Sequence, residues 1–117
     1  MAFRFKEEYS FSARHSDSTK IKKKYPDRIP VIVERYPNSK VEDIDKHKFL
    51  VPADVTVGQF LFIIRKRIQI SKETALYLIV KKDIPQCTTS IGQLYTDFRD
   101  DDGFLYVHYS GENSFGC

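Results

Sequence analysis

The chain has 117 residues, 41% hydrophobic and 30% charged, with a formal net charge of only +3, a balance that suits a small globular protein. This length predicts one domain around one core. Two cysteines are too few for a disulfide framework, and no apolar run approaches the ~18 residues of a membrane-spanning helix, so any membrane association is expected to be peripheral or covalent.

The charges are unevenly distributed along the chain. Residues 1–30 contain eight lysines and arginines against four acidic residues, whereas residues 93–117 contain one arginine against five acidic residues. This asymmetry predicts that the two ends attract each other, and the basic end could also meet an acidic partner. The run Lys22–Lys24 is compatible with a nucleic-acid or tubulin contact, but the solvated end of a helix explains it more simply.

Two short helices are predicted at the N-terminal end, over residues 3–9 and 11–24. The first segment has more aromatic surface than a free tail needs, so we expect it to dock on the domain through Phe3, Phe5, Tyr9 and Phe11. Pro26 ends the second helix, because proline has no N–H to continue the ladder.

Two strands are predicted next, over residues 29–33 and 48–52, with a polar loop at residues 38–47 between them. The first is rich in β-branched residues. Both faces of this strand are apolar: one holds Ile29, Val31 and Val33, and the other holds Pro30 and Ile32. We therefore expect a central helix to cover one face and the N-terminal helices to cover the other. Pro52 is typical of an edge strand, and a free edge can accept an extended peptide.

Residues 57–68 are predicted to form the main helix. Thr56 is a good N-cap, and Gln59 stands at the reciprocal position of a capping box. On a 3.6-residue period one face is expected to fill the core, through Val57, Leu61, Ile64 and Ile68. A flanking stripe holds Phe60, Ile63 and Arg67, and it is either buried as well or kept for a partner.

The C-terminal half predicts a strand at residues 75–80, a short helix at 91–98 and a last strand at 104–109. The order of elements, two helices, ββαβ, a short helix and β, predicts an α+β fold of the ubiquitin-like β-grasp type with two additional N-terminal helices. We divide the chain into a helical extension packed on the domain, a β-grasp core and a flexible tail, over residues 1–26, 27–110 and 111–117.

Catalytic and metal-binding patterns are poor. No pair of histidines has metal-ligand spacing, and the Asp100–Asp102 run is interpreted as a solvated acidic turn. A nucleophilic Cys87 with His47 or His108 is an alternative, but no glycine loop for an oxyanion hole accompanies it. We therefore expect no enzyme activity, no metal and no cofactor.

The chain ends in Phe115, Gly116 and Cys117. A glycine fits a narrow enzyme groove, and removal of Cys117 would leave the Gly116 carboxylate as a reactive end. A penultimate glycine is a weak signal on its own, because many tails contain one. Cys117 does not fit the prenylation pattern, whose cysteine stands four residues from the end.

Four stretches share longer motifs with a known family; they are Lys24–Glu34, Phe49–Phe60, Ile64–Ile68 and Gly103–Gly116. Through them the chain resembles, essentially end to end, the autophagy ubiquitin-like modifiers, the group that includes the GABA receptor-associated protein and the microtubule-associated light chains. The resemblance implies that a processing cysteine protease cleaves between Gly116 and Cys117. Activating and conjugating enzymes then join Gly116 to phosphatidylethanolamine, and the protein is found in the cytoplasm and on the autophagosome membrane.

The resemblance also implies a groove for aromatic-x-x-aliphatic motifs of cargo receptors. The peptide adds beside residues 48–52. Its aromatic residue enters a pocket expected to comprise Ile21, Pro30, Ile32, Lys48, Leu50 and Phe104. Its aliphatic residue enters a second pocket, of Phe49, Val51, Pro52, Val55, Phe60 and Ile63. Acidic residues flanking the motif would meet Lys48 and an electrostatic rim of Arg28, Lys46 and Arg67. No nucleic-acid partner is expected.

One alternative keeps the groove without conjugation. The chain would then be an unconjugated ubiquitin-like adaptor in intracellular trafficking or on microtubules, where tubulin could contact its basic N-terminal part.

Overall fold

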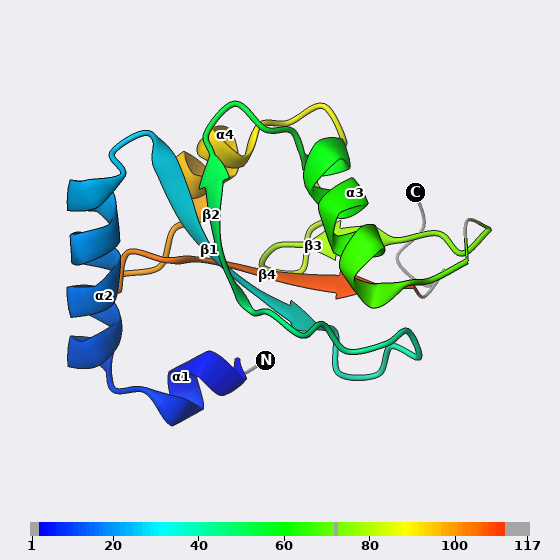
Figure 1. Ribbon diagram of the computed structural model, residues 1–117, viewed down its shortest axis with the longest axis horizontal. Helices are drawn as coiled ribbons and strands as arrows, with labels where there is room; N and C mark the ends of the chain where they lie inside the picture. The colour runs from blue at the N-terminus through cyan, green and yellow to red at the C-terminus, as the bar shows by residue number, and fades with distance from the viewer. Residues whose placement is uncertain (1–2, 72, 112–117) are drawn as a thin grey trace.

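The structure is a computed structural model that describes residues 3–71 and 73–111. In chain order its elements are α1 (Arg4–Glu8), α2 (Phe11–Lys24), β1 (Arg28–Arg35), β2 (Lys48–Pro52), α3 (Val57–Ile68), β3 (Tyr77–Ile79), α4 (Ile91–Phe98) and β4 (Leu105–Ser110) (Figure 1). Every predicted element is present. β3 is shorter than predicted, and β1 is longer.

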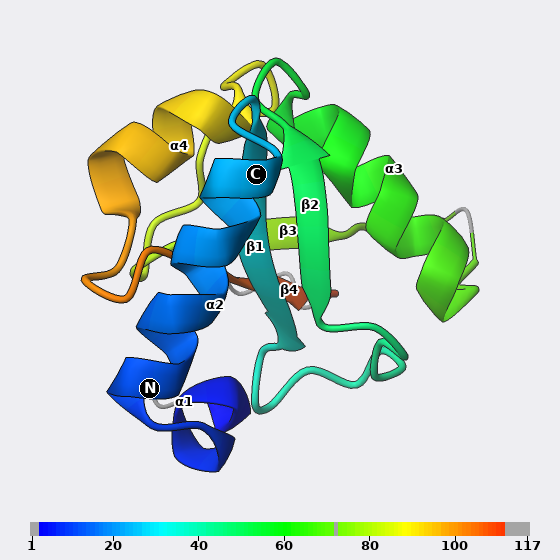
Figure 2. The same ribbon diagram turned by 60° about the vertical axis from the view of Figure 1, so that its left-hand side comes forward.

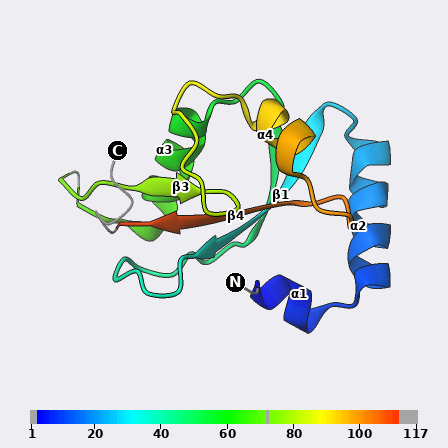
Figure 3. The same ribbon diagram turned by 180° about the vertical axis from the view of Figure 1, so that it is seen from behind.

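The strands form one mixed sheet in the order β2-β1-β4-β3. β1 runs antiparallel to β2 and parallel to β4, and β3 runs antiparallel to β4. The last strand therefore returns to the centre of the sheet and β2 lies at an edge, as predicted. Figures 2 and 3 show α2 and α3 on opposite sides of the strands.

The α3 side of the sheet holds the main core. Ile29, Val31 and Val33 of β1 face this cluster, together with residues of β2, β4 and α4. The predicted capping box is present: the Thr56 N–H donates to Gln59 Oε1 over 2.9 Å, and the Gln59 N–H donates to Thr56 Oγ1 over 3.2 Å.

The predicted core face of α3 is wrong at one position. Phe60 is fully buried, whereas Leu61 is only partly buried. The ring of Phe60 meets that of Phe49 edge-on at 5.6 Å between centroids, so the helix turns Phe60 toward β2. The face that fills the core is Val57, Phe60, Ile64 and Ile68.

The opposite side of the sheet is covered by α1 and α2, as predicted. A second buried cluster lies on this side and consists of Phe3, Ile32, Phe104 and Tyr106. The partly buried side chains of Phe5 and Ile21 pack against this cluster. Of the four aromatic residues expected to dock, however, only Phe3 and Phe5 pack in the cluster there, since Tyr9 and Phe11 are each 50% exposed. Ion pairs also join the basic N-terminal part to the acidic turn after α4, which confirms the expected attraction between the two ends: Lys6 to Asp100 over 2.5 Å and Arg14 to Asp102 over 2.6 Å.

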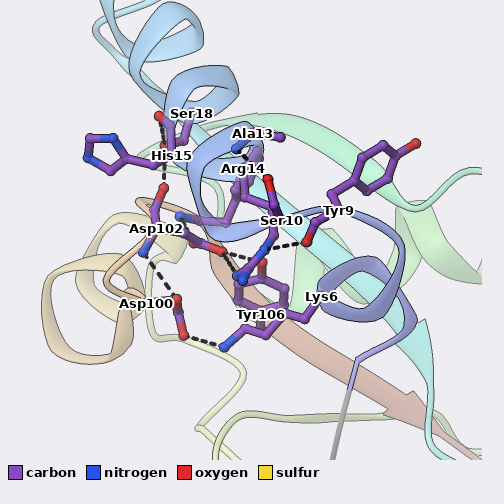
Figure 4. A network of polar contacts seen from close by, with 11 residues as sticks. Lys6, Tyr9, Ser10, Ala13, Arg14, His15, Ser18, Asp100, Asp102 and Tyr106 are labelled. Atoms are coloured by element: carbon purple, nitrogen blue, oxygen red, sulfur yellow. Dashed lines mark hydrogen bonds and ion pairs between the residues drawn. The ribbon is translucent and has the colours of Figure 1, made fainter.

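The acidic turn is more than a solvated loop, because Asp102 is 0% exposed. Its Oδ2 accepts from Arg14 over 2.6 Å and from the Tyr106 hydroxyl over 2.5 Å (Figure 4). Its Oδ1 accepts from the Phe104 N–H over 2.9 Å. Its carbonyl oxygen accepts from the Ser18 hydroxyl over 2.5 Å. Asp102 therefore joins α2 to β4, and burial raises the pKa of Tyr106.

Candidate functional site

The free edge of the sheet lies along β2. Within the described residues β2 pairs with β1 alone, in a register that sets Arg28 opposite Pro52 and Ile32 opposite Lys48. Along β2, Phe49 and Val51 are buried, Leu50 is half-buried, and the two ends are exposed. The strand therefore anchors itself through one face and leaves an edge where another strand can add.

The structure places the residues of the expected aromatic pocket at different depths. Ile21 and Leu50 are partly exposed, and Pro30 is buried. Ile32 and Phe104 are both 0% exposed and belong to the cluster under α1 and α2. In the expected pocket, Ile32 and Phe104 would therefore lie beneath the surface, and a ligand ring would meet Ile21 and Leu50 first.

The expected aliphatic pocket is divided in the same way. Phe49, Val51 and Phe60 belong to the main core, and Val55 packs against it. Pro52 is exposed, and Ile63 of α3 is 40% exposed. In the expected aliphatic pocket, Pro52 and Ile63 would therefore supply the exposed surface, and the buried members of the set would lie beneath it.

Basic side chains surround this edge. The Lys48 ammonium lies 2.8 Å from the Asp17 carboxylate, and Arg67 lies 3.1 Å from Asp45. The Lys46 ammonium and the Arg67 guanidinium stand over the Phe49 ring, at 5.1 and 5.9 Å from its centroid. At the other end of β2, Arg28 Nη1 donates to the Leu50 carbonyl over 3.4 Å. These exposed pairs are weak, so an acidic ligand can compete for the cations.

Two functional partners were missed by the sequence reasoning, Asp17 and Glu34. Asp17 holds Lys48 from 31 residues away in the chain. The Glu34 carboxylate accepts from the N–H groups of Arg4 and Phe5 over 2.9 and 3.0 Å, and so caps α1. No local pattern marks either residue, because both partners are remote in sequence.

The alternative of a cysteine nucleophile gains no support from the histidines. Burial lowers the pKa of His108 to about 4, which suits a proton acceptor poorly near neutral pH, and its ring stacks on Phe3 at 4.0 Å. His47 Nδ1 lies 2.9 Å from the Val33 carbonyl oxygen, and the Cys87 thiol is exposed. Within residues 3–71 and 73–111 no cluster of metal-ligating side chains occurs, and no helix has the length and apolarity to cross a membrane.

The expected conjugation residue, Gly116, and the expected cleavage partner, Cys117, lie outside the described residues. β4 ends at Ser110, so the segment that would bear the modification begins at the end of a central strand of the sheet.

Comparisons with known proteins agree with this architecture. The family described as "Autophagy protein Atg8 ubiquitin like" matches residues 13–116. A crystal structure of ATG8 from Trypanosoma brucei is similar to the chain with a TM-score of 0.90 and 38% sequence identity, over 94% of this chain and 95% of that one. The match confirms the ubiquitin-like fold. With nearly the whole sequence matched and the fold shared, the chain belongs to the Atg8 family of ubiquitin-like autophagy proteins.

Proposed function

We propose that this protein is a modifier rather than a catalyst, and that it is conjugated to phosphatidylethanolamine during autophagosome formation. A processing protease removes Cys117, and activating and conjugating enzymes attach the Gly116 carboxyl to the lipid amine. The lipid-linked form is on the autophagosome membrane, and the free form is in the cytoplasm. Family membership supports this reading, and the family match ends at Gly116, one residue before Cys117.

We also propose that the β2 edge binds aromatic-x-x-aliphatic motifs of cargo receptors. The observation that supports it is the edge itself: an unpaired strand side among the described residues, apolar surface from Leu50 and Ile63, and cations at Lys48 and Arg67. An added strand gains main-chain hydrogen bonds, and the side chains on either side give specificity.

Conjugation is tested by mass spectrometry of the C-terminal peptide from cytosolic and membrane fractions of starved cells. We expect a cytosolic peptide ending at Gly116 and a phospholipid-bearing form on membranes. Gly116→Ala should abolish the lipid-bearing form, and Ser114→Ala is the matched control that should retain it. A peptide ending at Cys117 in every fraction contradicts conjugation. Unchanged localisation of Gly116→Ala would favour the alternative, an unconjugated adaptor in trafficking or on microtubules.

The groove is tested with two neighbouring apolar residues of α3. Ile63 belongs to the expected pocket and is 40% exposed, whereas Phe62 is 57% exposed and outside it. In calorimetry with a motif peptide, Ile63→Ala should cost about 1–2 kcal/mol of binding free energy, and Phe62→Ala should leave it unchanged. Leu50→Ala is a second test. Phe104→Ala is unsuitable, because this fully buried ring supports the fold. Equal affinity for both α3 variants contradicts the groove.

A further inference from the structure

A cavity of about 520 Å³ lies at the opposite edge of the sheet from β2. Its walls come from α1, from β3 and β4, and from the turn that follows β3. This volume falls within the usual range for sites that bind small molecules. It is separate from the groove proposed above, and none of the expected motif-binding residues lines it.

Three aromatic rings line one side of the cavity. Phe3 stacks on His108 with ring centroids 4.0 Å apart and an interplanar angle of 15°, and it meets Tyr106 at 5.0 Å. All three side chains are buried, and Ile79 of β3, Tyr36 and Phe98 add further apolar lining. Because the Tyr106 ring is tilted by 52° to that of Phe3, a flat aromatic guest can stack on one ring and meet another edge-on.

The rim of the cavity is positively charged. Lys6 is already engaged, because its ammonium lies 2.5 Å from Asp100 and 4.7 Å from the centroid of the Tyr106 ring. Lys81 and Lys82 are exposed, and among residues 3–71 and 73–111 neither forms an ion pair. Asp100 is paired with Lys6 and also interacts electrostatically with Lys81. Three lysines still line the cavity against this one carboxylate, so its mouth carries a net positive charge.

The turn that presents these lysines is a tight one. Val80 and Asp83 exchange backbone hydrogen bonds over 2.8 and 2.9 Å, and the two residues between them have φ angles of +52° for Lys81 and +80° for Lys82. Lysine is unfavourable in this left-handed region, where glycine and asparagine are the preferred residues. The backbone therefore holds two lysines at the cavity mouth at some conformational cost.

We propose that this cavity binds a small aromatic carboxylate. The ring of the ligand lies against Phe3, Tyr106 and His108, and its carboxylate meets the ammonium groups of Lys81 and Lys82. The two parts of the site match the two parts of such a ligand, an apolar flat body and one negative charge. Binding at this site does not depend on the motif groove or on conjugation.

The test uses 2-naphthoate as the probe and 2-naphthamide, its neutral counterpart, as the matched ligand control. Both are titrated into the full-length chain at low ionic strength and followed by two-dimensional amide NMR. We expect saturable shifts at the amides of Ile79, Lys82 and His108, with naphthoate binding about 3- to 10-fold more tightly than naphthamide, as two partly exposed charge pairs allow.

Two double variants distinguish the charge of the lysines at the cavity from the overall positive charge of the protein. Lys81→Asn/Lys82→Asn should reduce the affinity for naphthoate to that for naphthamide, and the fold should be retained because asparagine tolerates the left-handed turn. Lys20→Asn/Lys23→Asn removes the same charge from exposed positions of α2 outside the cavity and should bind naphthoate as the parent does. Shifts confined to residues 48–52, equal affinity for the two ligands, or equal loss in both double variants would overturn the proposal.

Discussion

The two faces of the sheet are held by different kinds of interaction. The α3 face buries an apolar cluster to which every strand of the sheet contributes. The other face buries only four side chains in its cluster and adds charged contacts from Glu34, Asp102, Asp100 and Asp17. Apolar packing is non-directional and insensitive to pH, whereas charged contacts depend on geometry, protonation and salt.

The difference is clearest for α1. This helix has five residues and buries none of them, so it is far too short to persist alone. Its place depends on Phe3 just before it, on the carboxylate of Glu34, and on the contacts of Phe5 and Lys6. The N-terminal helices are therefore the part of the fold that can be loosened without unfolding the core, and four experiments can break or sharpen this contrast.

The largest effect is expected from Ile64→Ala, in the core of the α3 face. Ile64 is fully buried, and its truncation should lower the free energy of unfolding by about 4 kcal/mol because a cavity remains. Urea denaturation measures the change. Phe62→Ala on the same helix is the control and should cost less than about 0.5 kcal/mol. A similar small loss for Ile64→Ala would contradict the assignment of the core.

Asp102→Asn tests the polar face and should lower the unfolding free energy by about 3 kcal/mol. The amide keeps the shape but leaves the enclosed Arg14 guanidinium without its charge partner. Amide exchange should accelerate more in α2 than in α3. The neighbouring Asp101 is exposed, so Asp101→Asn is the matched control and should have little effect. Uniform acceleration in α2 and α3 would show that the two faces are not separable.

The pH dependence of stability should come in part from His108. Burial lowers its pKa from 6.5 to about 4, so between these values the unfolded chain binds a proton that the folded chain does not. Stability should therefore be greatest above pH 6.5 and fall by about 2 kcal/mol as the pH decreases to 4. His108→Phe keeps an aromatic ring against Phe3 and should flatten this part of the profile in urea titrations. An unchanged slope in the variant would assign the effect to other groups.

The smallest effect is expected from Glu34→Gln. The neutral amide has one acceptor oxygen where the carboxylate has two, so the cap on α1 weakens by about 1 kcal/mol. Exchange of the Arg4 and Phe5 amides should accelerate while the core amides stay protected. Glu7→Gln, at an exposed position of α1, is the control. Equal exchange in both variants would mean that the contacts of Phe3, Phe5 and Lys6 hold the helix without the cap.

Much of the fold could be predicted because its signals are local. The capping box of Thr56 and Gln59 predicted the start of α3, and the β-branched run predicted β1. The start of α4 is also local, because the Ser90 side chain accepts from the Gln93 N–H. For these elements the deciding partners lie within four residues along the chain, or alternate along a single strand.

The candidate site could be predicted only as a set of residues. The sequence pattern does not separate Ile63, which is exposed, from Phe60, which is fully buried, since both stand on one stripe of the same helix. The depth of Ile32 and Phe104 follows from the helices placed over them. Exposure is a property of the packed layers, so it enters only with the tertiary structure.

The sequence by itself determined the order of the elements, the two apolar faces of β1 and the membership of a family, since these depend on periodicity and local motifs. Tertiary structure alone decided that Asp102 is a buried link rather than a solvated turn, that Glu34 caps α1, and that Lys81 and Lys82 border an aromatic cavity. Arg14 and Asp102 are 88 residues apart, and Arg4 and Glu34 are 30 apart. Pairings of this kind arise only when the sheet brings remote segments together, and no local pattern encodes them.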